Sequence, residues 1–403
     1  MTQPTQRARA ARVATWIYFT LNGFGVGLWV VHIPNVERAT EITHSTLGLL
    51  LLLLGGSAFI GMQVGGGLAD RLGQRKLVPA AGVLMGVALF GPGLADSWWT
   101  LGLSLMVLGF SNGLIDVGMN AQAVVVERAY PRPIMAAFHA MWSIGGAGAA
   151  LVGAGLLGVG VRTEVSLGTA GVLIVIISLA TARFLLEPDH HATPAEDAPK
   201  PKVKAGKLVW FLGALAFAMM LAEGVAADWA ALHFKDILNT SASTAAFAYG
   251  TFSVAMTVGR FATDRVAAIV GPKAILRWGA ALAAAGLTIA AASPWVPLAL
   301  VGWMLCGLGL SGGVPQLFTA AGNLDTRSAG TLMARVVGLG YVGILAGPAL
   351  VGGLTHWMPL NVAFALPVVL CALAAVFAYV MPGSGTKPAG DSLQLSESGR
   401  EER

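Results

Sequence analysis

The stretch GGLADRLGQRK, residues 66–76, is the most informative part of the sequence for the fold. It places two glycines, an Asp-Arg step, a third glycine and two basic residues directly after a long apolar segment. A second stretch, GRFATDRVAAIVGPK (259–273), repeats this order with glycine, Asp-Arg, glycine and a basic residue, again after an apolar segment. Each stretch follows the second apolar segment of a six-segment unit. The chain therefore consists of two similar halves.

The composition is that of a membrane protein. Of 403 residues, 56% are hydrophobic and only 11% are charged, and the mean hydropathy is +0.72. Soluble domains carry roughly 25% charged residues. A membrane-crossing helix needs about 20 apolar residues. The segments of that length predict twelve transmembrane helices, at 13–33, 45–66, 77–95, 98–126, 133–158, 164–186, 208–233, 244–263, 274–292, 296–321, 329–355 and 360–381.

The basic residues predict the orientation of these helices. With the N-terminus inside, 22 of the 25 Lys and Arg fall on the cytoplasmic side, including the group at 260–277, and only Arg38, Arg162 and Lys235 fall outside. Cytoplasmic loops of membrane proteins carry such an excess. We therefore expect a multi-pass protein of the plasma or inner membrane with both termini in the cytoplasm. The net charge of +5 reflects this topology and gives no reason to expect a nucleic-acid partner.

A polar stretch divides the apolar segments six and six. Residues 187–207 are charged and rich in proline, as flexible linkers are. We therefore expect an N-terminal six-helix bundle over 1–186, a cytoplasmic linker over 187–207 and a C-terminal six-helix bundle over 208–381. The remaining residues, 382–403, have the composition of a disordered tail.

Over essentially its whole length the sequence resembles the transporters of the major facilitator superfamily. The stretch GGLADRLGQRK is similar to the loop between the second and third helices of that superfamily. Internal repeats are also typical of secondary transporters. The resemblance implies an all-α membrane fold of twelve transmembrane helices in two pseudo-symmetric six-helix bundles. These bundles would enclose a central cavity that opens alternately to each side of the membrane.

Polar residues inside the predicted spans concentrate in the first helix of each three-helix unit. Because an unpartnered polar group in hydrocarbon costs several kcal/mol, these helix faces must be shielded from lipid. The resemblance places helices one, four, seven and ten around the cavity, in agreement with this distribution. The exceptions are Gln63 and His139. The main set is Asn22 in the first span, Asn112, Asp116 and Asn120 in the fourth, Glu223 and Asp228 in the seventh, and Gln316 in the tenth.

Two acids are the predicted proton carriers. Asn112, Asp116 and Asn120 are spaced i, i+4, i+8, so they share one helix face. Intramembrane ionisable residues are functional candidates because their burial is unfavourable, and removal from water favours the protonated form of a carboxylic acid. We therefore expect Asp116 and Glu223 to carry protons. His139 is a third candidate because histidine titrates near physiological pH, and it could pair with Asp116 or Asn120. The alternative is that these acids only hydrogen-bond between helices.

The remaining polar groups predict a substrate site. Tryptophans near them would add stacking surfaces, although tryptophan is also common at membrane interfaces. The predicted substrate-binding residues are Asn22, Trp29, Asn112, Asn120, Trp142, Asp228 and Gln316.

Residues 114–149, LIDVGMNAQAVVVERAYPRPIMAAFHAMWSIGGAGA, resemble the fucose permease-like branch of the superfamily. The fourth helix of that branch carries an acid followed four residues later by asparagine, and Asp116 and Asn120 match this pair. The resemblance implies that the acid takes part in sugar recognition and proton coupling. The first helix of this chain departs from the branch, because LWVVHIPNV (28–36) has no acid and offers only His32.

The loop after the second span is predicted to act as a gate. Glycines at its start permit close helix packing and Gly73 allows a tight turn. Asp70 can face the positive end of a helix, which by the resemblance is the eleventh. The basic residues after Asp70 can engage Glu127 or lipid phosphates, and an Asp-Arg pair would act similarly in the second half. The predicted gating residues are Gly66, Asp70, Arg71, Gly73, Arg75, Lys76, Glu127, Asp264 and Arg265.

These features predict a monomeric secondary active transporter. We expect it to move a small polar solute, with a sugar or related metabolite as candidates, by alternating access and proton-coupled symport. Drug or metabolite efflux by proton antiport is the alternative, but the fourth span lacks an embedded arginine and the fifth lacks a Gly-Pro pattern. A non-transporting receptor would not need two midplane acids. No enzymatic activity and no cofactor or metal site is expected, because the sequence shows neither a phosphate loop nor metal-ligand spacing.

Overall fold

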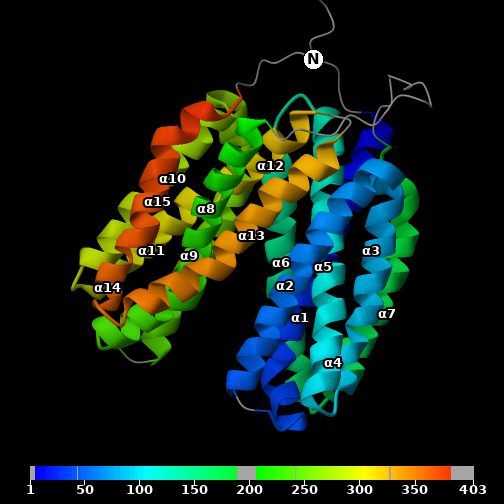
Figure 1. Cartoon of the computed structure of the whole chain (residues 1–403), viewed down its shortest axis with the longest axis horizontal. Helices are drawn as coiled ribbons and strands as arrows, with labels where there is room; N and C mark the ends of the chain where they lie inside the picture. Colours follow the sequence, from blue (N-terminus) through cyan, green and yellow to red (C-terminus); the bar gives the residue numbers. More distant parts are fainter. Residues whose placement is uncertain (1–4, 43, 188–205, 241, 326–327, 383–403) are drawn as a thin grey trace, which may run out of the picture.

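The computed structural model describes residues 5–42, 44–187, 206–240, 242–325 and 328–382, and within these ranges it contains helices but no strands. The predicted linker (187–207) and tail (382–403) lie almost wholly outside the described residues. The helices form two bundles that lie side by side (Figure 1).

The first bundle contains seven α-helices. They are α1 (Gln6–Ala39), α2 (His44–Leu72), α3 (Gln74–Ala88), the short α4 (Phe90–Leu94), α5 (Trp98–Arg128), α6 (Met135–Gly158) and α7 (Thr163–Thr181), followed by a 3-10 turn at Ala182–Phe184.

The second bundle begins after the linker. It contains α8 (Lys207–Leu232) with a π-helical turn at His233–Ile237, α9 (Ala242–Val270), α10 (Pro272–Ala292), α11 (Val296–Leu310), α12 (Gly313–Asn323), α13 (Ala329–Leu354), α14 (Leu360–Ala363) and α15 (Ala365–Phe377), with a final 3-10 turn at Ala378–Val380.

Eleven helical segments among the described residues are long and apolar enough to cross a membrane. In this count α3 with α4, α11 with α12 and α14 with α15 each form one segment. The remaining predicted span corresponds to α9, which at 29 residues is long enough to cross but is less apolar. It carries several hydroxyl side chains together with Arg260, Asp264 and Arg265. Arg260 and Asp264 have partners in the other bundle, and Arg265 is exposed, which explains how α9 tolerates these charged groups.

The two bundles are built on the same helix pairings. In the first bundle α1 packs along α6, and in the second α8 packs along α13; likewise α2 packs on α5 as α9 packs on α11. Glycines allow the equivalent close approaches. A Cβ atom on Gly23 would lie 2.1 Å from the carbonyl oxygen of Trp142, and one on Gly224 would lie 2.5 Å from the carbonyl oxygen of Ile344. Small residues of this kind let helix backbones pack closely in lipid.

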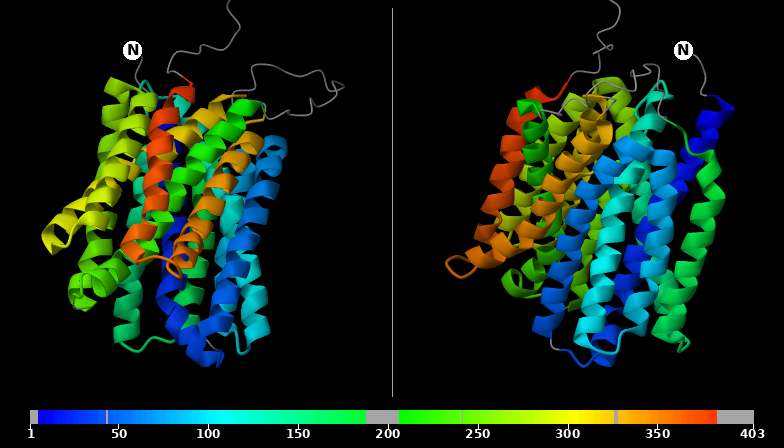
Figure 2. Two further views of the ribbon diagram at one scale, coloured as in Figure 1. Left: turned by 60° about the vertical axis from the view of Figure 1, so that its left-hand side comes forward. Right: turned by 45° about the vertical axis from the view of Figure 1, so that its right-hand side comes forward.

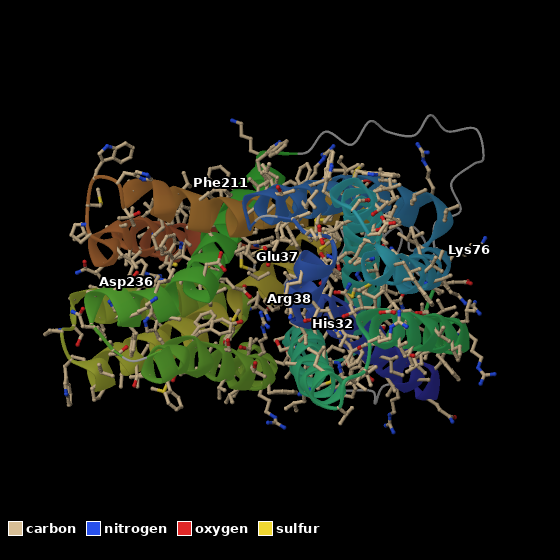
Figure 3. All side chains as sticks on the ribbon, turned by 90° about the horizontal axis from the view of Figure 1, so that it is seen from below. His32, Glu37, Arg38, Lys76, Phe211 and Asp236 are labelled. Atoms are coloured by element: carbon tan, nitrogen blue, oxygen red, sulfur yellow. The ribbon has the colours of Figure 1, made fainter. Side chains whose placement is uncertain are left out.

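The described chain begins and ends at the same face of the molecule. The start of α1 and the turn after α15 both lie at the top of Figures 1 and 2, and we call this side the terminal face. Arg38 lies in the last turn of α1, Arg162 just before α7 and Lys235 in the turn after α8, at the ends of these helices away from the terminal face. Figure 3 views the opposite face, with Glu37 and Arg38 at the end of α1 and Asp236 on the second bundle.

Candidate functional site

Three predicted substrate residues meet inside the first bundle. The Asn22 side chain on α1 accepts a hydrogen bond from the indole N–H of Trp142 at 2.7 Å and donates one to the Asn112 side chain at 2.8 Å. Asn22 is buried, whereas Asn112 and Trp142 are partly exposed. This contact joins α1, α5 and α6 and presents an amide and an indole at the edge of the cluster.

Asp116 and Asn120 lie on α5 among buried neighbours. The Asn120 side chain donates to the backbone carbonyl of Asp116 at 2.9 Å and more weakly to its Oδ1 at 3.5 Å. The other oxygens, Oδ2 of Asp116 and Oδ1 of Asn120, are buried without a hydrogen-bond partner. An unpartnered buried polar atom costs free energy. A proton or a polar ligand would provide the missing partner.

The predicted pairing of His139 with Asp116 or Asn120 is wrong. Its Nε2 atom is buried without a hydrogen-bond partner. The ring instead lies between aromatic rings, with its centroid 5.5 Å from that of Phe19 and 5.8 Å from that of Phe318. Aromatic packing therefore fixes this histidine, and it touches α12 of the second bundle.

Arg260 is a central residue that the sequence analysis did not identify. It is only 8% exposed, and its guanidinium donates to the Ser143 hydroxyl at 2.6 Å and to Glu223 Oε1 at 3.2 Å. Ser143 belongs to α6 of the first bundle and Glu223 to α8 of the second. Arg260 thus forms a polar bridge between the bundles.

The position of Arg260 corrects its assignment to the cytoplasmic group at 260–277. Helix α9 continues to Val270, so Arg260 lies about 15 Å from the helix end at 1.5 Å per residue. The residues predicted to face the cavity are all Asn, Gln, Asp, Glu, His or Trp, whereas Lys and Arg were expected almost entirely on the cytoplasmic side. A signal was present in the repeat, because GRFATDR places Arg260 one helical turn deeper than Asp264.

Tyr341 of α13 is a second residue that the sequence analysis missed. It lies close enough to Asp116 and Glu223 to interact electrostatically with both acids. These acids come from different bundles. Tyr341 therefore places the two predicted proton carriers around one shared centre.

Other predicted residues lie outside this centre. Trp29 is 3% exposed within the core of the first bundle, so it offers no free stacking surface. Asp228 is exposed on α8, and the helix turns about 140° between Glu223 and Asp228. Gln316 is buried on α12, and its Nε2 atom has no hydrogen-bond partner. His32 contacts the Ser166 hydroxyl at 2.8 Å within the first bundle.

Acids join the two bundles at the terminal face. The carboxylate of Asp70, at the end of α2, accepts hydrogen bonds from the backbone N–H groups of Gly330 at 2.7 Å and Thr331 at 2.9 Å, and from the Thr331 hydroxyl. These N–H groups belong to the first turn of α13. A helix N-terminus carries free N–H donors and a partial positive charge, so Asp70 caps a helix of the other bundle.

Close packing accompanies the contact of Asp70. A Cβ atom on Gly66 would lie 2.5 Å from that of Ala334 and 2.7 Å from the Gly330 carbonyl oxygen. At the following turn Gly73 has a φ of 78°, which favours glycine. The second half repeats the turn, with Gly271 at a φ of 84°.

Glu127 and Arg128 complete the contacts of this face. Glu127 accepts from the backbone N–H of Met135 at 2.7 Å and from the Thr319 hydroxyl at 2.8 Å, which connects α5 to α12. Arg128 donates to the carbonyl oxygen of Gly322 at 2.6 Å and to the Asn323 side chain at 2.7 Å. Both side chains therefore attach the first bundle to α12.

The prediction that basic residues engage Glu127 is wrong, because backbone N–H groups and a hydroxyl already occupy its oxygens. Arg75 pairs with Glu187 at 2.6 Å, within the first bundle. Arg71, Lys76 and Arg265 are exposed. Within the part of the chain that the structure describes, no group of three or more His, Cys, Asp or Glu could hold a metal ion.

Comparisons with known proteins agree with this architecture. The model of the Major Facilitator Superfamily matches residues 15–232 and 211–396. The chain belongs to the Major Facilitator Superfamily. An uncharacterised MFS-type transporter of Yersinia pestis is 35% identical over 380 residues, covering 93% of this chain and 97% of that protein. The membrane protein MosC of Rhizobium meliloti is 31% identical over 384 residues, covering 93% of this chain and 91% of that protein.

Less similar transporters also match over most of this chain. The enterobactin exporter EntS of Escherichia coli is 25% identical over 362 residues, covering 83% of this chain and 82% of that protein. A crystal structure of the transporter FucP in the outward conformation superimposes with a TM-score of 0.76 at 15% identity, covering 91% of this chain and 97% of that one. The predicted superfamily and its all-α, two-bundle fold are confirmed, and the matches are to transporters rather than enzymes.

Proposed function

We propose that this membrane transporter is a monomer that couples proton movement to the uptake of a small polar solute. The observation that supports it best is a set of buried polar atoms without partners on α5, α6 and α12, helices that pack on one another across the bundle interface. Because such atoms are unfavourable in a dry interior, a polar solute and a proton would stabilise them. The atoms are Oδ2 of Asp116, Oδ1 of Asn120, Nε2 of His139 and Nε2 of Gln316.

Proton coupling would use Asp116 and Glu223. Both acids act electrostatically on Tyr341, one from each bundle, so a change in the protonation of either acid alters the electrostatic interaction across the interface. Asp116 has a buried oxygen without a partner, which favours its neutral form. His139, packed between Phe19 and Phe318, would serve as a third proton site.

Alternating access would proceed by rocking of the two bundles, residues 1–186 and 208–381, joined by the linker 187–207. The terminal face carries most of the basic residues, and the positive-inside rule therefore makes it cytoplasmic. The carboxylate of Asp264 accepts hydrogen bonds from the backbone N–H groups of Ala136 and Ala137 at the start of α6. This contact and those of Asp70, Glu127 and Arg128 hold that face closed in this conformation. Gating would then require these contacts to break.

The solute would be hydroxyl-rich. The Asn112 amide N–H groups suit hydroxyl partners, and the ring of Trp142, whose N–H is bonded to Asn22, would offer a stacking face. The solved structures with this fold include the fucose:proton symporter FucP of E. coli. Efflux by proton antiport is the second candidate, and the relationship to the enterobactin exporter EntS supports it.

Purified protein in liposomes would test these proposals. A panel of labelled sugars and polar metabolites is offered outside vesicles whose lumen is either more alkaline or more acidic than the medium. Symport predicts accumulation only with the alkaline lumen, and antiport only with the acidic lumen, whichever way the protein inserts. Equal movement of every solute under both gradients would refute proton coupling.

A further inference from the structure

Arg260 and Glu223 form a nearly buried ion pair, in which the negative charge of Glu223 balances the positive charge of Arg260. The two side chains are only 10% and 22% exposed, and the Nε atom of Arg260 is buried without a hydrogen-bond partner. Two other ion pairs of the described chain, Arg75 with Glu187 and Arg162 with Glu164, include strongly exposed side chains. The Arg260 pair is therefore held in a much drier place, between the bundles.

Protonation of Glu223 would leave this arginine unbalanced. A guanidinium remains charged in proteins, and removal of the partner of a buried charge is strongly unfavourable. The Ser143 hydroxyl supplies a dipole but no negative charge. A neutral solute arriving with the proton would leave the same cost in place, whereas an anionic solute would remove it.

Several other groups surround the pair, and none of them replaces Glu223. Asp116 on α5 and Glu223 both act on Tyr341 of α13, His139 on α6 lies within the field of Arg260, and Cys306 on α11 lies within the field of Glu223. Asp264, one turn from Arg260, has both oxygens bonded to the start of α6. Asp116 interacts with Tyr341, and among the described residues the ion pair of Arg260 is with Glu223.

We propose that Arg260 binds a carboxylate of the transported solute in exchange for Glu223, so that the solute is a small polyhydroxy carboxylic acid rather than a neutral sugar. The inference rests on the proposed transport function and names its substrate class. Arginine presents a planar set of donors that matches a carboxylate in two-point contact, and its Nε is free to make one of these bonds.

The rest of the solute would face the first bundle. Ser143 follows Trp142, which is bonded to Asn22 and through it to Asn112. Hydroxyl groups of the solute would therefore meet the Asn112 amide, beside the ring of Trp142, while its carboxylate meets Arg260. The proton moves onto Glu223 as the carboxylate takes its place, so binding of the acid and binding of the proton strengthen each other. The anion and the proton on Glu223 together carry no net charge, and the proton that Asp116 would carry is additional to this pair.

Matched acid and neutral pairs test the inference on the full-length protein in detergent. Equilibrium binding is measured for labelled gluconate against sorbitol and galacturonate against galactose, with glucosamine as the cationic probe. We expect at least one acid to bind at least tenfold more tightly than its neutral partner. Equal binding of acid and neutral partner, binding of glucosamine alone, or no binding of either acid would overturn the assignment.

Three variants locate the effect. Arg260→Gln should weaken binding of the acid at least tenfold, and Arg260→Lys should keep part of it because the charge remains. Lys273→Gln, which removes an exposed basic residue of the same bundle, is the matched control and should bind like the natural protein. Unchanged acid affinity in Arg260→Gln contradicts the inference.

Glu223→Gln provides a test that does not depend on losing function. Because no carboxylate then competes for Arg260, the acid should bind at least as tightly as in the natural protein and equally between pH 6 and pH 8. The acid should also raise the unfolding temperature of this variant more than that of the natural protein. If the acid raised the unfolding temperature of Glu223→Gln less than that of the natural protein, the proposed exchange of Glu223 for the solute carboxylate would be wrong.

The two proposals fail separately. Proton-driven accumulation of a neutral sugar that Arg260→Gln leaves intact would refute the carboxylate site and keep the transport function. Tight binding of an acid that neither pH gradient accumulates would refute proton-coupled transport and keep the site.

Discussion

The carboxylate of Asp264 on α9 accepts a hydrogen bond of 2.9 Å from the backbone N–H of Ala136 on α6, in the other bundle. Its second oxygen accepts one of 2.8 Å from the next N–H, that of Ala137. Asp70 makes the same two contacts in the opposite direction, from α2 to the second and third residues of α13. The sequence repeat therefore produces two equivalent caps that join the bundles at the terminal face.

Asp70→Asn and Asp264→Asn should each shift the protein toward a conformation with this face open. A hydrogen bond to a charged group contributes about 1.5–3 kcal/mol, so we expect roughly a tenfold larger open population for each variant and a further increase for the double variant. The reporter is Val124→Cys on α5. Val124 is 1% exposed and lies against Gly322 of the second bundle.

Labelling of Val124→Cys with a membrane-impermeant maleimide, applied to the terminal face in inside-out vesicles, measures this opening. The native Cys306 and Cys371 are both buried, which keeps the background low. Glu187→Gln removes an acid that pairs with Arg75 inside the first bundle and is the control. Labelling of the double variant at the rate of the control would show that these caps do not hold the face closed.

Asp116→Asn should abolish proton-driven accumulation and leave exchange of solute across the membrane. The amide keeps the size of the side chain but cannot carry a proton, whereas exchange of bound solute needs only the rocking of the bundles. Accumulation and counterflow are measured in the same liposomes. Proton-driven accumulation that persists with the natural pH dependence would rule out Asp116 as the carrier.

Gly66→Val should stop transport without unfolding the protein. A Cβ atom at this position would lie 2.5 Å from that of Ala334, at the contact between α2 and α13, whereas one on the neighbouring Gly67 would meet nothing within 4 Å. We therefore expect Gly66→Val to prevent closure of the terminal face and to raise labelling at Val124→Cys. Gly67→Val should behave like the natural protein, and equal behaviour of the two variants would contradict a tight closed contact.

The fold, the two acids of the central site and the contact of Asp70 could be predicted from coarse features of the sequence. Apolar length and the placement of Lys and Arg are strong signals because burying charge in lipid is so unfavourable. For the same reason Asp116 and Glu223 stand out within their spans. The contact of Asp70 with the start of α13 agrees with the expectation from its loop, because the free N–H groups of a helix end attract an acid.

Arg260 could not be placed in the same way. A long basic side chain near the end of a span often extends to the interface, so sequence position does not reveal whether it is buried. Its place depends on how far α9 extends and on Ser143, which lies 117 residues away along the chain. The aromatic surroundings of His139 and the approach of Tyr341 likewise depend on contacts between bundles.

Helix contacts within the second bundle should limit its stability. A Cβ atom on Gly307 of α11 would lie 2.3 Å from the carbonyl oxygen of Phe252 on α9, whereas one on Gly250 of α9 would meet nothing within 4 Å. Overpacking of this kind costs about 1–3 kcal/mol, while alanine in place of an unhindered helical glycine stabilises the helix by about 1 kcal/mol. Gly307→Ala should therefore lower the unfolding temperature in detergent, and Gly250→Ala should keep or raise it.

A thiol-reactive dye reports unfolding, since Cys306 and Cys371 are buried in the same bundle and react once it opens. If the unfolding temperature of Gly307→Ala were at or above that of Gly250→Ala, α9 and α11 could move apart to accommodate a methyl group without a cost in stability. Their close packing would then not determine the stability of this bundle.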